Sequence, residues 1–260
     1  MRRTASLLAA GLLLLLTGGA PVAAQETSAA ENPAVETIAA DHTITFVNRS
    51  GETVWLGSSV NADESQQLTG LPVIEDGASA TITIPESGDP EYWRGKFFAR
   101  QDCSGEPGDT FHCEVGDCGP EADTCTTGEQ PTGLAEFNFD PNDAGAPWYN
   151  VSYVNGVALP ITIEANGATP PPDSGQCEEV GCSEKLLQHC PPENLTDGSD
   201  GQPQLCTNPS RDEETPYSDA VKEHCPRAYA WSKHDQEPGN NVMRNCPSCD
   251  GFTVTFHAGI

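Results

Sequence analysis

The sequence from residue 97 to residue 160 decides the fold, because strand-like segments and closely spaced cysteines alternate along it. The run contains FFARQDC at 97–103, HCEVGDCG at 112–119, GLAEFNF at 133–139 and WYNVSYVNGVALP at 148–160. Apolar and polar residues alternate in its strand-like segments, which is typical of β-strands with one buried face. An arginine and a scatter of acidic residues lie among these segments, so the run also holds candidate functional residues.

Similar alternation extends on both sides of this run. The turn signal Arg49-Ser50-Gly51 separates the segments 42–48 and 52–57, and the turn signal Asp76-Gly77 precedes the segment 79–85. The predicted strands are residues 42–48, 52–57, 79–85, 93–100, 134–139, 149–153, 159–164 and 252–257. Short strands joined by turns in this way predict an all-β protein built as a β-sandwich.

A different composition begins after the proline-rich stretch ATPPPDSG at 168–175. Residues 177–230 contain five cysteines, few β-branched residues and one helical candidate at 218–224. A segment of this size cannot bury enough apolar surface to fold alone. We therefore predict a loop-rich, disulfide-held subdomain at about 177–230, after which the chain returns to the sandwich for its last strand.

The N-terminus has the three parts of a secretory signal peptide, which we assign to residues 1–24. Its start is basic, residues 7–16 are apolar, and residues 22–24 are small, as a cleavage site requires. The apolar run is too short to span a bilayer, so no membrane span is predicted. Residues 25–40 are polar and alanine-rich and predict a flexible linker, which leaves 41–260 as the folded domain. Secretion implies an oxidising compartment, where most of the cysteines should form disulfides.

The chain is strongly acidic. Its 260 residues include 12 Lys and Arg against 39 Asp and Glu, a formal net charge of -27. Removal of residues 1–24 takes away two arginines and no acids, so the mature charge is 10 minus 39, or -29. Such a surface repels nucleic acid and anionic membranes. It suits cationic ligands, neutral partners such as sugars, or simply solubility in salt.

No familiar metal or cofactor motif occurs in the sequence. The histidines do not follow a metal-binding spacing such as HExxH, and neither a G-x-S-x-G elbow nor a phosphate-binding loop is found. We therefore predict no metal and no cofactor. The histidines are His42, His112, His189, His224, His234 and His257.

Several motifs in order resemble those of one family. They are AR-x-x-C at 99–103, GDCG at 116–119, GLAEF at 133–137, WYNVSYVNGVALP at 148–160 and YSDAVKEHCPRAYAW at 217–231. Together they resemble the thaumatin-like proteins over about residues 42–257, nearly the whole mature chain. The resemblance implies a shortened thaumatin-like β-sandwich with a disulfide-rich loop subdomain and a small disulfide-bonded hairpin region.

The resemblance also implies a set of disulfides. The implied pairs are Cys103–Cys113, Cys118–Cys125, Cys177–Cys246, Cys182–Cys225 and Cys190–Cys206. Cys249 is left over, in a CPSC sequence with Cys246, where a redox or zinc role is the alternative to a spare cysteine. A family disulfide between the first and last strands is lost, because Ser50 and His257 occupy its positions. Such a long-loop clamp is worth about 4–5 kcal/mol on the chain-entropy model.

Family members that bind or cut β-1,3-glucan are thought to use an acidic cleft lined by one arginine, one glutamate and three aspartates. Carried over onto this sequence, the arginine is Arg100 and the glutamate is Glu136. Two of the aspartate positions hold Asn150 and Asn155. The third falls on His234, with Asp235 beside it as the alternative register.

These substitutions bear on the chemistry. Glycoside hydrolysis normally needs two carboxyl groups, and an amide has no titratable proton. Glu136 could act as the acid if Asp235, or else Asp117, faced it, and His234 could act as a base. The alternatives are structural: Arg100 could pair with Glu136, and Asp117 could shape the cysteine hairpin.

Sugar binding is less affected by the loss of carboxylates, because asparagine side chains both donate and accept hydrogen bonds. The rings of Trp148, Tyr149 and Tyr153 could stack on sugars or pack in the core. We therefore predict a secreted monomer that binds a carbohydrate polymer of the β-1,3-glucan type, with an antifungal or defence role. A weak endo-β-1,3-glucanase is one alternative, with enzymatic activity the less favoured outcome. A protein-binding or inhibitory module is another.

Overall fold

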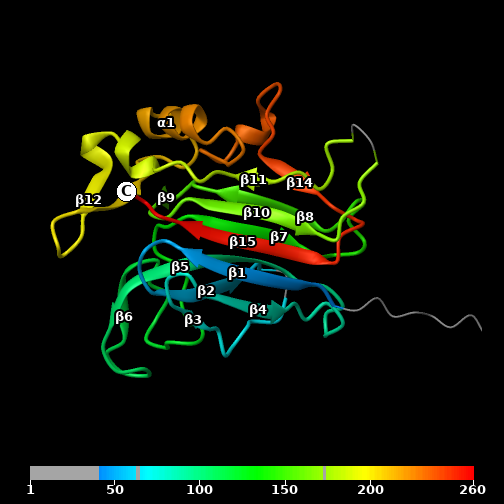
Figure 1. Cartoon of the computed structure of the whole chain (residues 1–260), viewed down its shortest axis with the longest axis horizontal. Coiled ribbons are helices and arrows are strands. Elements are labelled where there is room, and N and C mark those ends of the chain that lie inside the picture. Colours follow the sequence, from blue (N-terminus) through cyan, green and yellow to red (C-terminus); the bar gives the residue numbers. More distant parts are fainter. Residues whose placement is uncertain (1–40, 63–64, 172–173) are drawn as a thin grey trace, which may run out of the picture. The chain divides into compact units, whose positions relative to one another are not determined.

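The computed structural model describes residues 41–62, 65–171 and 174–260, and the predicted signal peptide at 1–24 and linker at 25–40 lie outside them. Strands predominate in the described chain (Figure 1). They are β1 (Thr43–Arg49), β2 (Val54–Val60), β3 (Val73–Ile74), β4 (Ser79–Thr83), β5 (Arg94–Ser104), β6 (His112–Val115), β7 (Leu134–Asn138), β8 (Trp148–Ser152), β9 (Gly156–Val157), β10 (Ile161–Asn166), β11 (Val180–Gly181), β12 (Leu195–Asp197), β13 (Pro203–Thr207), β14 (Met243–Asn245) and β15 (Gly251–His257). The helical segments are η1 (Leu186–His189), η2 (Pro192–Asn194), α1 (Pro216–His224) and η3 (His234–Gln236).

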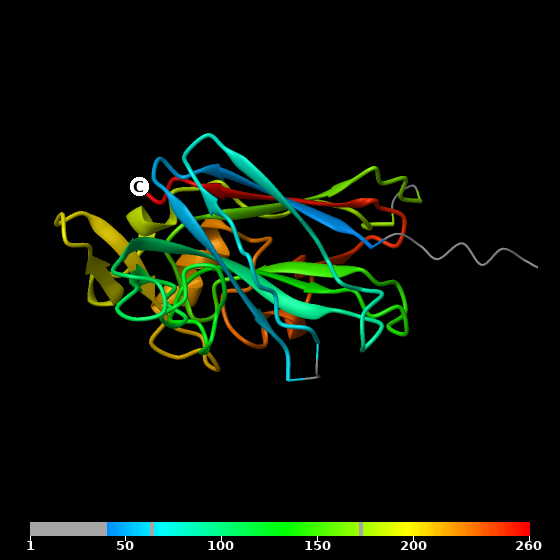
Figure 2. The ribbon, with the colours of Figure 1, turned by 90° about the horizontal axis from the view of Figure 1, so that it is seen from below.

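Two sheets form the sandwich. One has the strand order β11-β10-β15-β1-β4, and the other has the order β14-β8-β7-β5-β2-β3 with β6 paired to β5. Figure 2 shows them as two layers, with β15 (red) in one and β5 (green) in the other. A third, small sheet of β12, β13 and β9 lies outside the sandwich. The all-β sandwich predicted from the alternating segments is therefore confirmed.

Aromatic side chains fill the space between the two layers. Phe46 of β1 contacts Phe97 of β5, with ring centroids 4.9 Å apart. Phe252 of β15 contacts both Phe137 of β7 at 5.2 Å and Tyr149 of β8 at 4.9 Å. Alternation along each strand places these rings inside and leaves their sequence neighbours on the outer face. The outer face of the β14-to-β3 sheet is the surface that carries the candidate site.

The first and last strands of the sandwich pair without a covalent link. β1 and β15 run parallel, and Arg49 lies opposite His257, one residue before Ser50. The Ser50 hydroxyl donates to Asn48 Oδ1 at 2.7 Å, and His257 Nε2 lies 3.0 Å from the Thr162 hydroxyl. Local hydrogen bonds thus satisfy the two side chains that stand where the resemblance would place a disulfide.

Each of the strands predicted from alternation occurs, with ends shifted by a few residues. The predicted helix at 218–224 is α1, which begins two residues earlier because Thr215 and Ser218 form a capping box and Pro216 follows the cap. The strands that alternation did not reveal are short or have few residues facing the core: β3, β6, β9, β11, β12, β13 and β14.

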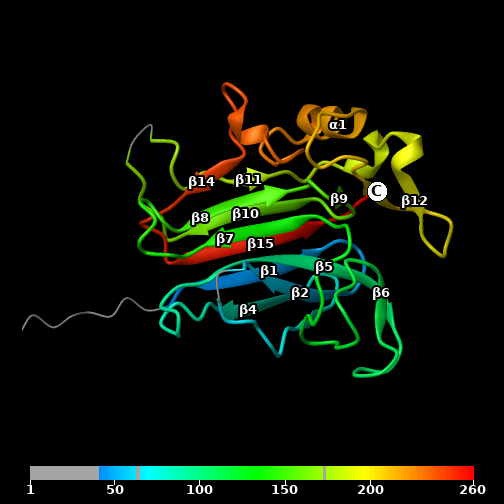
Figure 3. The ribbon, with the colours of Figure 1, turned by 180° about the vertical axis from the view of Figure 1, so that it is seen from behind.

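The region 177–230 covers one end of the sandwich, where α1, β12 and the C-terminus lie together (Figures 1 and 3). Leu186 and Leu187 of η1, and Tyr217 and Val221 of α1, join the main core. The five disulfides join the pairs that the resemblance implies: Cys103–Cys113, Cys118–Cys125, Cys177–Cys246, Cys182–Cys225 and Cys190–Cys206. Among the residues that the structure describes, no helix is long and apolar enough to cross a membrane.

Candidate functional site

A row of polar side chains crosses the outer face of the larger sheet. The strand register places Lys96 of β5 beside Glu136 of β7, Glu136 beside Asn150 of β8, and Asn150 beside Met243 of β14. Their chain neighbours Phe97, Phe137 and Tyr149 point into the core, so alternation forces these residues outward. Cross-strand neighbours of this kind have side chains close enough to interact directly.

A cavity of about 370 Å³ opens on this row. It is lined by a carboxylate from β7, amides from β7, from β8 and from the residue after β2, an aspartate from the loop after β7, and two large side chains: Glu136, Asn138, Asn150, Asn61, Asp143, Trp148 and Met243. Trp148 is half-buried, and its indole N–H donates to the Ala144 carbonyl at 3.2 Å. The lining combines an aromatic surface with several hydrogen-bonding groups, as small-molecule sites commonly do.

Glu136 is the central charged group of the cavity. Burial raises the pKa of its carboxyl above the ordinary value, against the opposing effects of the Lys96 charge and a hydrogen bond from Asn150. The nearby carboxylate of Glu129 adds to the upward shift. Lys96 is shared between the two acids, since its Nζ lies 2.8 Å from Glu129 Oε1. Glu136 is therefore a carboxyl group held partly out of water, with one cation beside it.

The side chain of Asn150 has one hydrogen-bond acceptor without a partner among the described residues. The residue is only 9% exposed and its amide donates to Glu136. Its Oδ1 atom is buried and has no hydrogen-bond partner within the described parts of the chain. Buried polar atoms are nearly always hydrogen-bonded, so an unpartnered oxygen on a residue that lines a cavity points to a ligand donor.

Asn155 lies at a different cavity. This second space, of about 420 Å³, is lined by Asn155 together with Glu129, Asn208 and Arg211. Two charged residues of this second cavity act on the pKa of Glu136: the positive charge of Arg211 lowers it, and the negative charge of Glu129 raises it. The two asparagines at expected aspartate positions thus belong to neighbouring hollows.

Arg100 is placed differently from the expected cleft position. It is fully buried, and its guanidinium donates to the carbonyls of Gly119 at 3.2 Å and Glu121 at 2.9 Å. Its Nη2 lies 4.0 Å from Asp117 Oδ1, and its guanidinium carbon lies 4.8 Å from the centroid of the Phe111 ring. Arg100 therefore holds the cysteine hairpin against β5, and it has no exposed surface through which to contact a sugar.

Asp117 is also engaged in the hairpin. Its carboxylate accepts hydrogen bonds from the backbone N–H of Cys113 at 2.9 Å and of Gly119 at 3.4 Å. Neither cavity beside Glu136 includes Asp117 in its lining. Lys96 and Arg100 are four residues apart on β5, which corresponds to about 13 Å along a strand. Asp117 thus sits with Arg100, away from the Lys96–Glu136 pair.

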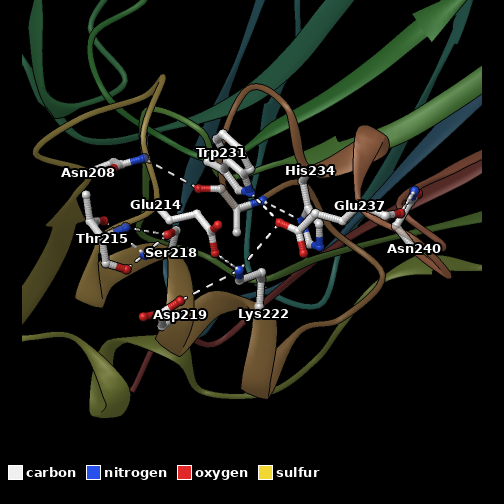
Figure 4. A network of polar contacts seen from close by, with 11 residues as sticks. Asn208, Glu214, Thr215, Ser218, Asp219, Lys222, Trp231, His234, Glu237 and Asn240 are labelled. Atoms are coloured by element: carbon white, nitrogen blue, oxygen red, sulfur yellow. Dashed lines mark hydrogen bonds and ion pairs between the residues drawn. The ribbon is translucent and has the colours of Figure 1, made fainter.

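His234 belongs to a polar network beside α1 (Figure 4). It is buried, its Nδ1 accepts from the Ala230 backbone N–H at 3.3 Å, and burial lowers its pKa. The neighbouring Glu237 accepts from the Trp231 indole at 2.6 Å and pairs with Lys222 at 3.4 Å. These contacts give His234 a place within the network, and it does not line either cavity beside Glu136.

Asp235 and Glu136 both interact with the side chain of Tyr229. Asp235 is exposed and hydrogen-bonds the Tyr229 phenol. Burial raises the pKa of Tyr229, and the charges of both Asp235 and Glu136 raise it further. Tyr229 is held beside β8 because its backbone N–H donates to the Val151 carbonyl at 2.8 Å. The charges of both members of the predicted catalytic pair, Asp235 and Glu136, therefore act on the Tyr229 phenol.

The three candidate stacking rings separate into two groups. Trp148 lines the cavity. Tyr149 and Tyr153 are fully buried, with the Tyr149 hydroxyl donating to the Glu178 carbonyl at 2.6 Å and the Tyr153 oxygen accepting from the Ile161 N–H at 2.7 Å. Tyr149 and Tyr153 therefore pack in the core and are not available to stack on a sugar.

Three charged residues at the site, Lys96, Glu129 and Asp143, were not among the residues predicted from the sequence. Lys96 could have been found, because it shares the outward-facing alternation of Arg100 on the same predicted strand. Glu129 and Asp143 lie in loops, where no periodicity indicates which way a side chain points. Asp143 is held by Arg94 at 3.2 Å and by the Asn138 amide at 2.5 Å.

Cys249 is the free cysteine among the described residues, and it has no second thiol beside it in the CPSC sequence. Cys246 of the CPSC sequence is bonded to Cys177. Cys249 is buried, and its thiol donates to the Cys246 carbonyl at 3.0 Å. The CPSC pair therefore offers only one thiol.

Comparison with known proteins agrees with this architecture. The sequence model of the thaumatin family matches residues 48–258. Thaumatin-like protein 1 of Pyrus pyrifolia is 30% identical over 232 residues, covering 82% of this chain and 89% of that protein. A glucan endo-1,3-beta-glucosidase of Prunus avium is 29% identical over 236 residues, with the same coverage of 82% and 89%.

Among solved structures, a laminaripentaose-producing β-1,3-glucanase in complex with laminaritetraose superposes with a TM-score of 0.53. The alignment has 11% sequence identity and covers 85% of this chain and 99% of that one, so it bears on the fold alone. The family match spans both sheets, the cysteine hairpin and the disulfide-rich region. The chain belongs to the thaumatin family.

Proposed function

We propose that this thaumatin-like protein is secreted and binds a carbohydrate polymer of the β-1,3-glucan type in the cavity around Glu136, with a role in defence. The observation that carries the proposal is Asn150, which lines that cavity and whose buried Oδ1 has no hydrogen-bond partner among the described residues. A sugar hydroxyl is a donor of the size and geometry that such an oxygen can accept. The relative from Prunus avium is named a glucan endo-1,3-beta-glucosidase, which supports this class of ligand.

The rest of the cavity suits a neutral sugar. Asn138 and Asn150 supply amide groups, Glu136 supplies a carboxyl, and Trp148 supplies a ring against which a pyranose face can lie. Each group is carried by a strand of the sheet or lies beside one, so its position is set before the ligand arrives. A pre-formed site of this kind loses little conformational entropy on binding. The five disulfides support secretion, because they form in an oxidising compartment.

Binding without cleavage follows from the groups that flank Glu136. Its neighbour on β8 is the amide of Asn150, which cannot serve as a nucleophile or base. Asp143, the other carboxylate in the cavity lining, is held by Arg94 and by the Asn138 amide. Glycoside hydrolysis by the two-carboxylate mechanism needs a second carboxyl group at about 5–9.5 Å from the first.

A weak endo-β-1,3-glucanase is the second candidate, and the raised pKa of Glu136 favours it. A carboxyl group that keeps its proton to higher pH is suited to protonate a leaving oxygen. Asp235, which acts on the same Tyr229 phenol, is the group that would complete the pair. A protein-binding or inhibitory role has less support, because the large exposed apolar residues among those described, Val73, Met243 and Ile260, lie on separate elements.

One experiment separates these candidates. Mature protein is tested for binding to laminarin by calorimetry and for release of reducing sugar, with Glu136→Gln and Asn150→Ala as site variants. His112→Ala, on the exposed face of β6, is the matched control. We expect binding without sugar release, at least about tenfold weaker for Asn150→Ala and unchanged for His112→Ala.

The other outcomes are equally informative. Sugar release that disappears in Glu136→Gln would favour the glucanase. Binding that is the same in wild type and Asn150→Ala would contradict the assignment of this cavity. If the wild type binds no β-glucan, both carbohydrate candidates are rejected.

A further inference from the structure

Two histidines and a glutamate that are separated in sequence meet at the surface of the disulfide-rich region. The ligand atoms that Glu184, His189 and His224 can offer all lie within 4.8 Å of one another. The imidazole rings of His189 and His224 stack with centroids 3.4 Å apart and an angle of 12° between their planes. His189 Nε2 lies 3.4 Å from Glu184 Oε1. This cluster plays no part in the cavity around Glu136.

The backbone that carries the cluster is held in place. His189 ends η1 and precedes Cys190, which is bonded to Cys206. His224 ends α1 and precedes Cys225, which is bonded to Cys182, two residues before Glu184. Leu186 of η1 and Val221 of α1 are buried in the main core. Each of the three ligands therefore projects from a segment that a disulfide or core packing fixes, so a ligand ion would not have to order the chain.

The side chains themselves are free to adjust. The Glu184 side chain is 54% exposed and that of His189 is 30% exposed. Two ligands of one Zn²⁺ ion, at about 2.0–2.1 Å each, can be no more than about 4 Å apart. Metal binding therefore requires these surface side chains to rotate, so that the stacked rings separate and the three ligand atoms come within that limit.

The surroundings attract cations. An adjoining hollow of about 520 Å³ is lined by Glu184 and His224 together with Glu164 and Glu179. Burial raises the pKa of Glu179, with a further contribution from the Glu164 carboxyl that it contacts, so acidic groups are already crowded there. With 39 acidic against 12 basic residues, the whole chain adds to this attraction.

We propose that Glu184, His189 and His224 form a binding site for a divalent transition-metal ion such as Zn²⁺, the ion used in the test below. Two imidazole nitrogens and one carboxylate oxygen are a donor set that Zn²⁺ accepts, with at least one position left for water. By the general order of affinities Cu²⁺ binds such a set more tightly still. Mg²⁺ and Ca²⁺ prefer oxygen ligands and do not suit it. A bound ion links η1 to α1 and so stabilises the disulfide-rich region.

The test is zinc titration of the mature, tag-free protein with its disulfides intact, followed by calorimetry and by the thermal unfolding temperature. We expect saturable binding of one Zn²⁺ per molecule and a rise in unfolding temperature that EDTA reverses. His189→Gln and His224→Gln should each weaken binding by about tenfold or more, and the double variant should lose both effects. Mg²⁺ and Ca²⁺ at equal concentration should have neither effect.

Matched controls keep the assignment specific. His112→Gln, on β6, and Glu193→Gln, on η2, change the same residue types at exposed positions outside the cluster and should bind Zn²⁺ as the wild type does. Because His189 is at the surface, its glutamine variant should fold normally, as circular dichroism can verify. Wild-type protein that shows no saturable Zn²⁺ binding, or a double histidine variant that binds as the wild type does, would overturn the proposal.

Discussion

The two halves of strand β5 show how one pattern serves two purposes. Arg94, Lys96, Phe98 and Arg100 alternate along the same outer face. In the first half the side chain of Lys96 is 24% exposed and meets acidic groups beside an open cavity. In the second half Arg100 is fully buried under the cysteine hairpin and bonds to its carbonyls.

The comparison shows that the role of a charged residue on β5 depends on whether another segment covers its side chain. Where the hairpin lies on the strand, Phe98 packs with Cys118, Cys125 and Leu134, and Arg100 becomes an internal support. Where the strand is uncovered, the charges of Lys96 and Glu136 remain near water and can meet a ligand. A functional role should therefore be sought in the uncovered half, and stability should depend on the covered half.

The largest expected effect concerns stability. Arg100→Ala leaves the carbonyls of Gly119 and Glu121 without their buried charged donor, so we expect a loss of about 3 kcal/mol in the free energy of unfolding. Denaturant unfolding measures it. Lys96→Met, in the open half, should cost no more than about 1 kcal/mol. Equal losses for the two variants would contradict the division of β5 into a covered and an open half.

A second test removes a disulfide of the cysteine hairpin that covers Arg100. Cys118 and Cys125 close a loop with a sequence separation of 7. The chain-entropy model gives about 2.5 kcal/mol for a loop of this length, so Cys118→Ala with Cys125→Ala should reduce the free energy of unfolding by about that amount. Laminarin affinity of the folded variant should stay unchanged. A large change in affinity would show that the hairpin contributes to the site.

In the open half the expected effect is on binding. Trp148→Ala removes the ring that lines the cavity and should weaken laminarin binding about tenfold, or about 1.4 kcal/mol, as measured by calorimetry. Val73→Ala truncates an exposed apolar residue, 47% accessible, on β3 and serves as the control. If both variants bind as the wild type does, the ring is not part of the site.

The smallest expected effect is a pH dependence. Because burial raises the folded-state pKa of Glu136, the folded protein holds this proton more tightly than the unfolded chain does. Stability from this group is therefore greatest below the unfolded pKa of about 4.3 and declines as the pH rises through the folded pKa. Glu136→Gln should remove that decline, so the variant should gain stability relative to wild type between about pH 4 and about pH 7. Urea unfolding of both proteins across this range measures the difference, and a gap that stays constant would contradict the raised pKa.

Local pattern determined much of what the sequence could reveal. Alternation with period two indicated the strands that build both sheets, because a strand with one buried face must repeat its apolar residues at that interval. The motif order indicated the family and, through it, the pairing of the ten bonded cysteines. Glu136 and Asn150 could be placed in the site because both lie on strands whose outward residues the alternation identifies.

Tertiary structure alone decided which of these outward residues stay open. The burial of Arg100 depends on a hairpin that folds back from residues 113–125, and the pairing of Lys96 with Glu129 depends on a loop. The meeting of His189 with His224 requires η1 and α1 to pack together. Periodicity reports only which face of its own element a side chain occupies. What covers that face is set by packing between distant segments, and that is why the sequence identified the strands while the structure located the cavity and the histidine cluster.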